Sequence, residues 1–126
     1  MNILEAIKDK LVTAGIGTFG TNLFIGELPS DKKNAILIVT APSSPPNPSI
    51  GVFEQQVDFW TRYSNSQQGY AKLKQIEALL HRAANYEMGD YHVYISNSMS
   101  SVDDMDRDSE RRKMWKLTIR FIYRED

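Results

Sequence analysis

The C-terminal part of the chain alternates between apolar and polar side chains. From residue 115 to residue 124 the odd positions carry large apolar residues, and the even positions carry mainly polar or basic ones. The apolar set is Trp115, Leu117, Ile119, Phe121 and Tyr123. Successive side chains of a β-strand point to opposite faces of the sheet, so this pattern predicts a long strand with one face on a hydrophobic core.

Residues 52–62 show the same alternation. The predicted core face carries Phe53, Val57 and Phe59, and the opposite face is mostly charged or polar but includes Trp60 and Arg62. Such two-sided strands are typical of antiparallel sheets that cover a core on one side. Apolar and β-branched runs at residues 23–25, 35–40 and 92–95 indicate further strands, and residues 35–40 are expected inside the sheet.

Apolar positions at intervals of three and four predict two helices, over residues 2–14 and 66–84. Asn2 is the expected cap of the first helix, and residues 64–67 match a capping box before the second. The 126 residues suit one domain, residues 1–126. The predicted fold class is α+β: a two-layer sandwich in which both helices cover one face of a mainly antiparallel sheet of four or five strands.

Charge and cysteine content exclude several classes of protein. The chain has 15 Lys and Arg against 16 Asp and Glu, a net charge of -1, which does not fit a dedicated nucleic-acid binder. The absence of cysteine removes disulfides, thiolate metal sites and cysteine nucleophiles. The longest aliphatic run, residues 35–39, is far too short to cross a bilayer, so no membrane contact is expected. No secretory signal is visible, and we expect a protein made and kept inside a cell.

The segment Gly15-Ile16-Gly17-Thr18-Phe19-Gly20 fits the GxGxxG pattern of dinucleotide-binding proteins. That mechanism needs a strand before the glycines and a helix after them, so that the helix N-terminus holds the pyrophosphate. Here a predicted helix precedes the glycines and a predicted strand follows them. A helix-to-strand turn is therefore the favoured interpretation.

Two oppositely charged clusters follow each other late in the chain. The acidic cluster is Asp103, Asp104, Asp106, Asp108 and Glu110, and the basic cluster is Arg111, Arg112 and Lys113. The acidic cluster is not an EF-hand, because counting from Asp104 puts Ser109 and Trp115 where that loop needs Gly and Glu. The basic cluster could contact phosphates or an acidic partner, but a charged hairpin surface is the favoured interpretation.

Catalytic machinery is not apparent in the sequence. The two histidines, His81 and His92, match no metal-ligand spacing such as HExxH, and a GxSxG elbow is absent. We expect a non-enzymatic protein without a cofactor or metal. An enzyme or a small-molecule binder is the least favoured class.

Surface features instead predict protein contacts. Pro45, Pro46 and Pro48 belong to a stiff proline-rich loop, and the alternation leaves Trp60 and Tyr63 facing away from the core together with Val52 and Ile122. Outward aromatic side chains beside arginine are typical of protein–protein interfaces, and packing beneath a helix is the alternative interpretation. The expected interface residues are Pro45, Pro46, Pro48, Trp60, Arg62, Asp103, Asp104, Asp106, Asp108, Arg111, Arg112 and Lys113.

Three short motifs carry a family resemblance. The chain reads FIGELP at residues 24–29, NAI at 34–36 and PPNPSIG at 45–51, and a long predicted strand and a helix with an L…I…LL pattern follow. In this order over residues 24–123, the sequence resembles the minor capsid or tail-terminator proteins of long-tailed bacteriophages. It departs from that pattern in the long acidic insertion at residues 103–108.

The resemblance implies a small α+β protein that assembles into a ring, commonly six-fold, at the head-proximal end of the tail. Its expected partners are copies of itself, the tail tube protein and head–tail connector proteins, with DNA only passing through the ring. It implies a place in the virion, after assembly in the host cytoplasm. A neck or head-completion subunit, or an unrelated protein-binding domain, is the alternative.

Overall fold

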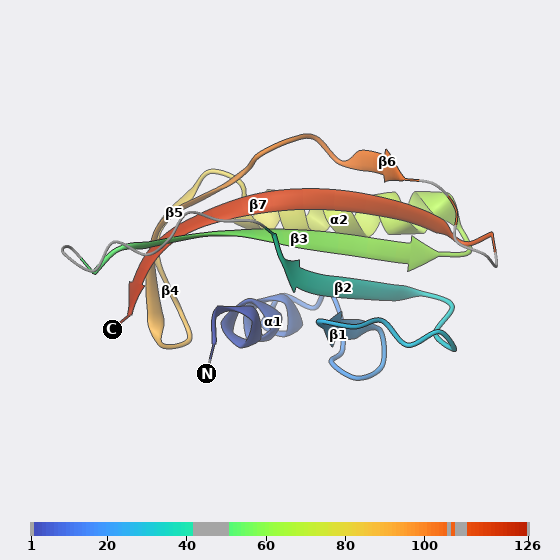
Figure 1. Cartoon of the computed structure of the whole chain (residues 1–126), viewed down its shortest axis with the longest axis horizontal. Coiled ribbons are helices and arrows are strands. Elements are labelled where there is room, and N and C mark those ends of the chain that lie inside the picture. Colours follow the sequence, from blue (N-terminus) through green and yellow to red (C-terminus); the bar gives the residue numbers. More distant parts are fainter. Residues whose placement is uncertain (1, 42–50, 106, 108–110, 126) are drawn as a thin grey trace.

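The computed structural model describes residues 2–41, 51–105, 107 and 111–125. Within these residues the order of elements is α1 (Ile3–Thr13), β1 (Leu23–Ile25), β2 (Ala35–Thr40), β3 (Phe53–Tyr63), α2 (Ser66–Leu80), β4 (Ala83–Met88), β5 (Tyr91–Ser98), β6 (Asp103–Met105) and β7 (Lys113–Glu125). The fold is α+β, with two helices and one open, mostly antiparallel sheet of seven strands in the described residues. Figure 1 shows the long strands β3 and β7 side by side through the middle of the molecule.

The sheet is built around these two strands. Its order is β1-β2-β3-β7-β5-β4, and β6 also pairs with β7, beyond the end of β5. The pair of β1 and β2 is parallel, whereas every other pair is antiparallel. The predicted interior position of residues 35–40 is confirmed, because β2 lies between β1 and β3.

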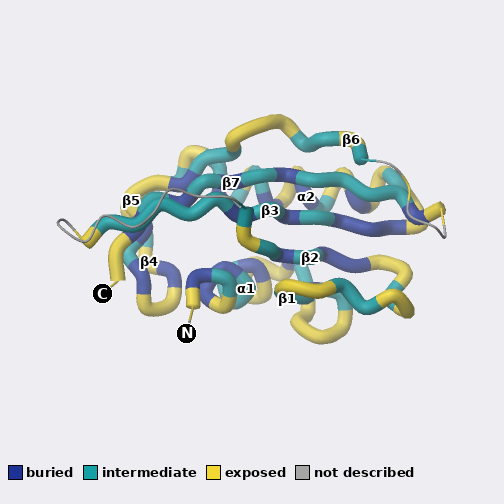
Figure 2. The backbone as a smooth tube through the Cα atoms, in the orientation of Figure 1, coloured by how far each residue is buried: buried dark blue, intermediate teal, exposed yellow. Residues whose placement is uncertain are grey.

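One face of the sheet forms the core. Phe59 pairs with Leu117 and Val57 with Ile119, and all four side chains are fully buried. The apolar stripes of both helices pack into the same cluster. Figure 2 shows the resulting alternation of buried and half-buried residues along β3 and β7. Burying a large aliphatic or aromatic side chain contributes about 1.5–3 kcal/mol, so this face is the main source of stability.

The helix starts are set by side-chain caps. The Asn2 side chain accepts a hydrogen bond from the Glu5 backbone N–H at 2.9 Å, which confirms the predicted cap of α1. At α2 the cap is Asn65, which accepts from Gln67 and Gln68, rather than Ser64 as the capping box predicted. Asn and Ser are both strong caps, so the sequence pattern did not decide between neighbours.

The structure corrects three expectations. In the residues that the structure describes, the sheet has seven strands, not four or five, because β4 and β6 were not expected. The second helix ends at Leu80 instead of continuing to residue 84, since Arg82 adopts a left-handed backbone with φ of 59° and β4 begins directly afterwards. Tyr63 lies in the core at 5% exposure, on the same face as Thr61, and does not face outward.

The position of α1 distinguishes this fold from a simple stack of a helical layer on a sheet. The helix contacts β1 and β2 near one edge of the sheet and β4 at the other. Figure 1 shows α1 between β4 and β1, below the arched central strands. The two-layer sandwich therefore stays a prediction.

Candidate assembly surface

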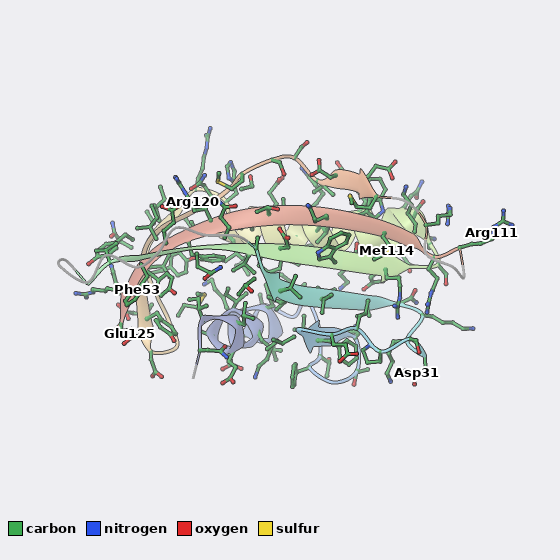
Figure 3. All side chains as sticks on the ribbon, in the orientation of Figure 1. Asp31, Phe53, Arg111, Met114, Arg120 and Glu125 are labelled. Atoms are coloured by element: carbon green, nitrogen blue, oxygen red, sulfur yellow. The ribbon has the colours of Figure 1, made fainter. Side chains whose placement is uncertain are left out.

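The second face of the sheet carries the polar side chains of β3 and β7. We call it the outer face and define it by Glu54, Gln56, Asp58 and Trp60 of β3 with Lys116, Thr118, Arg120 and Ile122 of β7. All eight side chains are half-buried. Figure 3 shows Arg120 and Met114 along β7 on this part of the molecule. The outer face thus offers both charge and apolar area to a partner.

Direct cross-strand pairs fix the geometry of the outer face. The Lys116 ammonium lies 5.5 Å from the ring centroid of Trp60, its partner across the ladder, as a cation–π contact. Thr118 donates a hydrogen bond of 2.5 Å to Asp58. These pairs hold the side chains in place before any partner binds, which lowers the entropic cost of association.

Arg120 lies in the middle of this face. Its Nη2 donates to the Asn97 side chain at 3.4 Å, and its buried Nε has no hydrogen-bond partner among the described residues. A guanidinium carries five donors, and only those other than the buried Nε are placed to reach an acceptor of a partner.

Two of the predicted interface arginines act inside the chain. Arg62 donates to the carbonyls of Pro29 and Lys32 at 2.5 and 2.7 Å, and Arg112 donates to those of Ser30 and Lys32 at 3.1 and 2.9 Å. Both are 7% exposed. They hold the loop between β1 and β2 against the ends of β3 and β7, so their role here is structural.

The late charged segment forms an antiparallel hairpin of β6 and β7. Lys113 donates to the Asp104 carboxylate and, at 2.9 Å, to the Met105 carbonyl, while Asp103 pairs in register with Lys116. Each described acidic residue of β6 therefore lies near a lysine, which offsets its negative charge locally. Arg111 is exposed at the end of the molecule where Asp31 also lies, as Figure 3 shows.

The structure brings together some predicted interface residues and leaves others outside its description. Trp60 of the outer face and Asp103 of the hairpin flank the same lysine, Lys116. Pro45, Pro46, Pro48, Asp106 and Asp108 lie outside the described residues. The sequence did not lead us to select Lys116 and Arg120. Both occupy even positions of the C-terminal alternation, which already places their side chains on the face opposite the core.

The histidines serve local structure. His81 ends α2 and accepts a hydrogen bond from the Ser98 backbone N–H at 2.9 Å, and His92 bonds Glu87 at 2.7 Å. In the part of the chain that the structure describes, no group of three His, Cys, Asp or Glu side chains could hold a metal ion. Neither described helix is long and apolar enough to span a bilayer.

The glycine segment forms the expected helix-to-strand turn. The Gly15 backbone N–H bonds the Val12 carbonyl at 3.0 Å, and Gly15 itself has a φ of 77°, which ends α1. β1 begins three residues after Gly20. No helix follows the glycines, so the geometry of a pyrophosphate site is absent from this segment.

Comparison with known proteins agrees with the resemblance in the sequence motifs. A family described as bacteriophage tail terminator protein matches residues 10–125, nearly the whole chain. No curated protein matches the sequence. The match covers both central strands, α2 and the charged hairpin, and the family is a structural one whose members belong to the virion and contact other phage proteins. The chain belongs to the bacteriophage tail terminator protein family.

Proposed function

We propose that this protein closes the head-proximal end of the phage tail tube as a ring and presents the surface to which head connector proteins attach. The observation that carries the proposal is the family match over residues 10–125. A ring grows by head-to-tail contacts that close on themselves, so each subunit needs two different complementary surfaces. Six subunits are the number we propose, from the resemblance of the sequence motifs to long-tailed phage proteins.

The outer face supports this role. It combines a preorganised aromatic side chain, Trp60, with the cations Lys116 and Arg120 on a rigid sheet. Aromatic residues and arginine are enriched where protein contacts bind most strongly. We propose that this face, with the β6–β7 hairpin and the loop of Pro45, Pro46 and Pro48, contacts neighbouring subunits or the tail tube.

DNA is proposed to touch the protein only while it passes through the ring. We place the acidic residues of the hairpin toward the bore, since negative charge weakens association with phosphates. Lys113 and Lys116 offset part of this charge, so the effect depends on the ring as a whole. A ring structure with the hairpin on its outer rim would refute this placement.

Electron microscopy of cells infected with a phage that lacks the gene tests the proposed function. Loss of a terminator leaves tube growth unchecked, so we expect overlong tails that carry no heads. Tails of normal length that fail to join heads would instead identify a neck subunit, and normal particles would contradict both roles. Wild-type protein supplied from a plasmid is the control that should restore tail length.

A further inference from the structure

The outer face continues onto the strands on either side of β3 and β7. Leu37 of β2 is the ladder partner of Trp60, and Phe24 of β1 is the partner of Leu37. On the other side, Ile95 of β5 is the partner of Ile122. Directly paired residues share one face of a sheet, so these side chains add apolar area to the outer face. We call the outer face together with Phe24, Leu37 and Ile95 the sheet surface.

Neither described helix covers the sheet surface. The buried side chains of α1 and α2 belong to the core cluster, which lies on the opposite face of the sheet. Phe24, Leu37 and Trp60 are half-buried, and Ile95 keeps 39% exposure although it is a large aliphatic residue. Partly exposed apolar side chains in a row across neighbouring strands are typical of an interaction surface.

The size of the sheet surface indicates a folded partner. The strands β1, β2, β3, β7 and β5 lie side by side and have 3, 6, 11, 13 and 8 residues. With a rise of about 3.3 Å per residue and about 4.8 Å between strands, their outline is on the order of 650 Å². A standard protein–protein interface buries about 800 Å² on each partner, so the sheet surface suits another folded protein rather than a short peptide.

The exposed side of α2 lies on the far side of the same molecule. The helix buries Gly69, Leu73, Ile76 and Leu80, so its other side faces away from the sheet. Figure 1 shows α2 behind β3 and β7. We call the exposed side of α2 the helix surface and define it by Gln67, Gln68, Tyr70, Ala71, Gln75 and Ala78. The sheet surface and the helix surface cannot meet within one molecule, but they can join successive copies head to tail.

The helix surface carries no unpaired charge. Exposed helix sides of globular proteins are usually rich in charged residues. The three charged side chains of α2 are already engaged within the molecule. Lys72 donates to the Ile16 carbonyl at 3.0 Å, and Lys74 pairs with Glu77 at 2.7 Å. Depletion of charge is what distinguishes the central part of a protein interface from the rest of a protein surface.

Each surface carries an aromatic side chain that is fixed before any partner binds. On the helix surface, Tyr70 is 41% exposed, and its ring makes an edge contact with the Trp115 ring at 5.1 Å between centroids. On the sheet surface, Trp60 is held by Lys116, and Arg120 lies nearby on β7. The three glutamine amides of the helix surface can accept hydrogen bonds from such cations without bringing a charge of their own. The two surfaces are therefore complementary in chemistry.

We propose that the helix surface of one copy packs on the sheet surface of the next copy, with Tyr70 beside Leu37 and Trp60. The occupant is a second copy because the sheet surface has the area of a protein–protein interface and this chain presents a charge-poor aromatic surface on its opposite side. The contact gives the sheet a helix on both faces, which is a common way to bury a sheet. It rests on the proposed ring, for which it supplies the head-to-tail interface.

Complementation between two blocked variants tests the contact. Ala71→Arg places a long cation in the middle of the helix surface, and Trp60→Ser removes the aromatic side chain of the sheet surface. We expect each variant alone to self-associate at least about tenfold more weakly than the wild type in sedimentation velocity, the size of effect seen at central interface residues. A mixture of the two should form one-to-one dimers and stop there, because each variant keeps the surface that the other has lost.

Matched controls separate the contact from general surface effects. Thr21→Arg adds the same cation to the turn between α1 and β1, and Val12→Ser removes an exposed apolar side chain of α1. Both positions lie outside the two surfaces, so both variants should assemble as the wild type does. Urea unfolding measures whether Trp60→Ser remains folded. Leu37→Lys is a second variant of the sheet surface, in which the lysine stem can follow the sheet while the ammonium stays in water.

Single cysteines provide an independent readout, because the chain has none of its own. A short bismaleimide should cross-link a mixture of Ala71→Cys and Leu37→Cys into dimers, and it should not cross-link Ala71→Cys with Val12→Cys. Blocked variants that still form rings, without the cross-link, would overturn the contact and leave the ring proposal intact. Cross-linked copies that build open chains in negative-stain images would support the contact and contradict the ring. A wild type that stays monomeric and gives no cross-link at the same concentration would contradict both.

Discussion

Arg62 and Arg112 show how single residues join distant parts of this chain. Together they donate hydrogen bonds to three backbone carbonyls between Pro29 and Lys32. Each of these bonds joins residues that are at least 30 positions apart in the sequence. If a buried carbonyl loses its donor, it remains out of water without a hydrogen bond. Removing the donor therefore destabilises the protein by more than the hydrogen bond itself contributes to stability. The loop between β1 and β2 therefore depends on side chains of the two central strands.

We expect Arg62→Ala to lower the free energy of unfolding by about 1–3 kcal/mol, because it leaves the Pro29 carbonyl without this donor. Urea unfolding followed by tryptophan fluorescence measures the change. Arg111→Ala is the matched control: Arg111 is exposed and adjacent to Arg112, so its loss should cost less than about 0.5 kcal/mol. Equal costs for Arg62→Ala and Arg111→Ala would contradict the structural role of Arg62.

Buried tyrosines make the fold sensitive to alkaline pH. Burial raises the pKa of Tyr63 above the usual value of 10.0, and it does the same for Tyr123. The unfolded chain then loses these protons first as the pH rises, so the stabilisation is complete below about pH 10 and is lost as the pH rises through the folded pKa. Unfolding free energies measured from about pH 8 to about pH 11 should fall at the alkaline end, and less steeply in Tyr63→Phe. A level profile would contradict this expectation.

At the scale of elements, α2 lies close to the sheet at Gly69. A Cβ at this position would lie 3.0 Å from the Thr61 hydroxyl and 3.2 Å from the Trp115 ring, and Thr61 donates a hydrogen bond to the Gly69 carbonyl at 3.2 Å. The Trp115 indole N–H also donates to the Ser66 carbonyl at 3.0 Å. The first turn of α2 is thus fixed on β3 and β7 by backbone contact, and a glycine makes this approach possible.

Gly69→Val should therefore destabilise the protein by about 1–3 kcal/mol, as overpacking in well-packed interiors does. Thermal unfolding measures the loss as a lower Tm. The control is Ala71→Val, at an exposed position of the same helix, where the cost of a β-branched residue stays below about 1 kcal/mol. If Gly69→Val were as stable as Ala71→Val, the helix would be able to move away from the sheet without loss of stability, which contradicts this prediction.

The elements also show why part of the fold could be read from the sequence. β3 and β7 were predictable because a period of two over about ten residues is hard to produce by any other structure. The end of α2 was not, since Arg82 takes a left-handed backbone that arginine rarely adopts and no glycine or proline marks the position. β6 was missed because Asp103 and Asp104 favour loops, and their strand exists through pairing with β7. The prediction that Tyr63 faces outward was wrong. Tyr63 comes two positions after Thr61, so the alternation of the strand puts both side chains on the core face.

For the surface, the sequence predicted that Trp60 faces away from the core, because the alternation fixes its face; the cation that lies over its ring is Lys116, which the sequence did not identify. Arg62 and Arg112 were selected as interface residues, and their charge gave no sign of the loop carbonyls that they bind, since these contacts join segments far apart in the chain. Phe19 was read as part of a turn, which is correct, but its exposure depends on how that turn sits against α1.

At the scale of the whole molecule, a nearly neutral protein with an α+β fold presents different surfaces on different sides. The outer face lies on the sheet, the exposed Phe19 side chain lies on the turn after α1, and a groove lies between α1 and the turn from β4 to β5. Distinct surfaces are what a closed head-to-tail ring and two further partners require. The chain belongs to the bacteriophage tail terminator protein family, and we propose that these surfaces serve assembly at the end of a tail.

The most direct test of that purpose is the length of tubes grown from purified tail tube protein of the same phage, measured by electron microscopy with and without this protein. We expect tubes that receive the protein during growth to stop elongating and to carry a ring at one end. Tubes that grow to the same lengths in the presence of saturating wild-type protein would contradict the account.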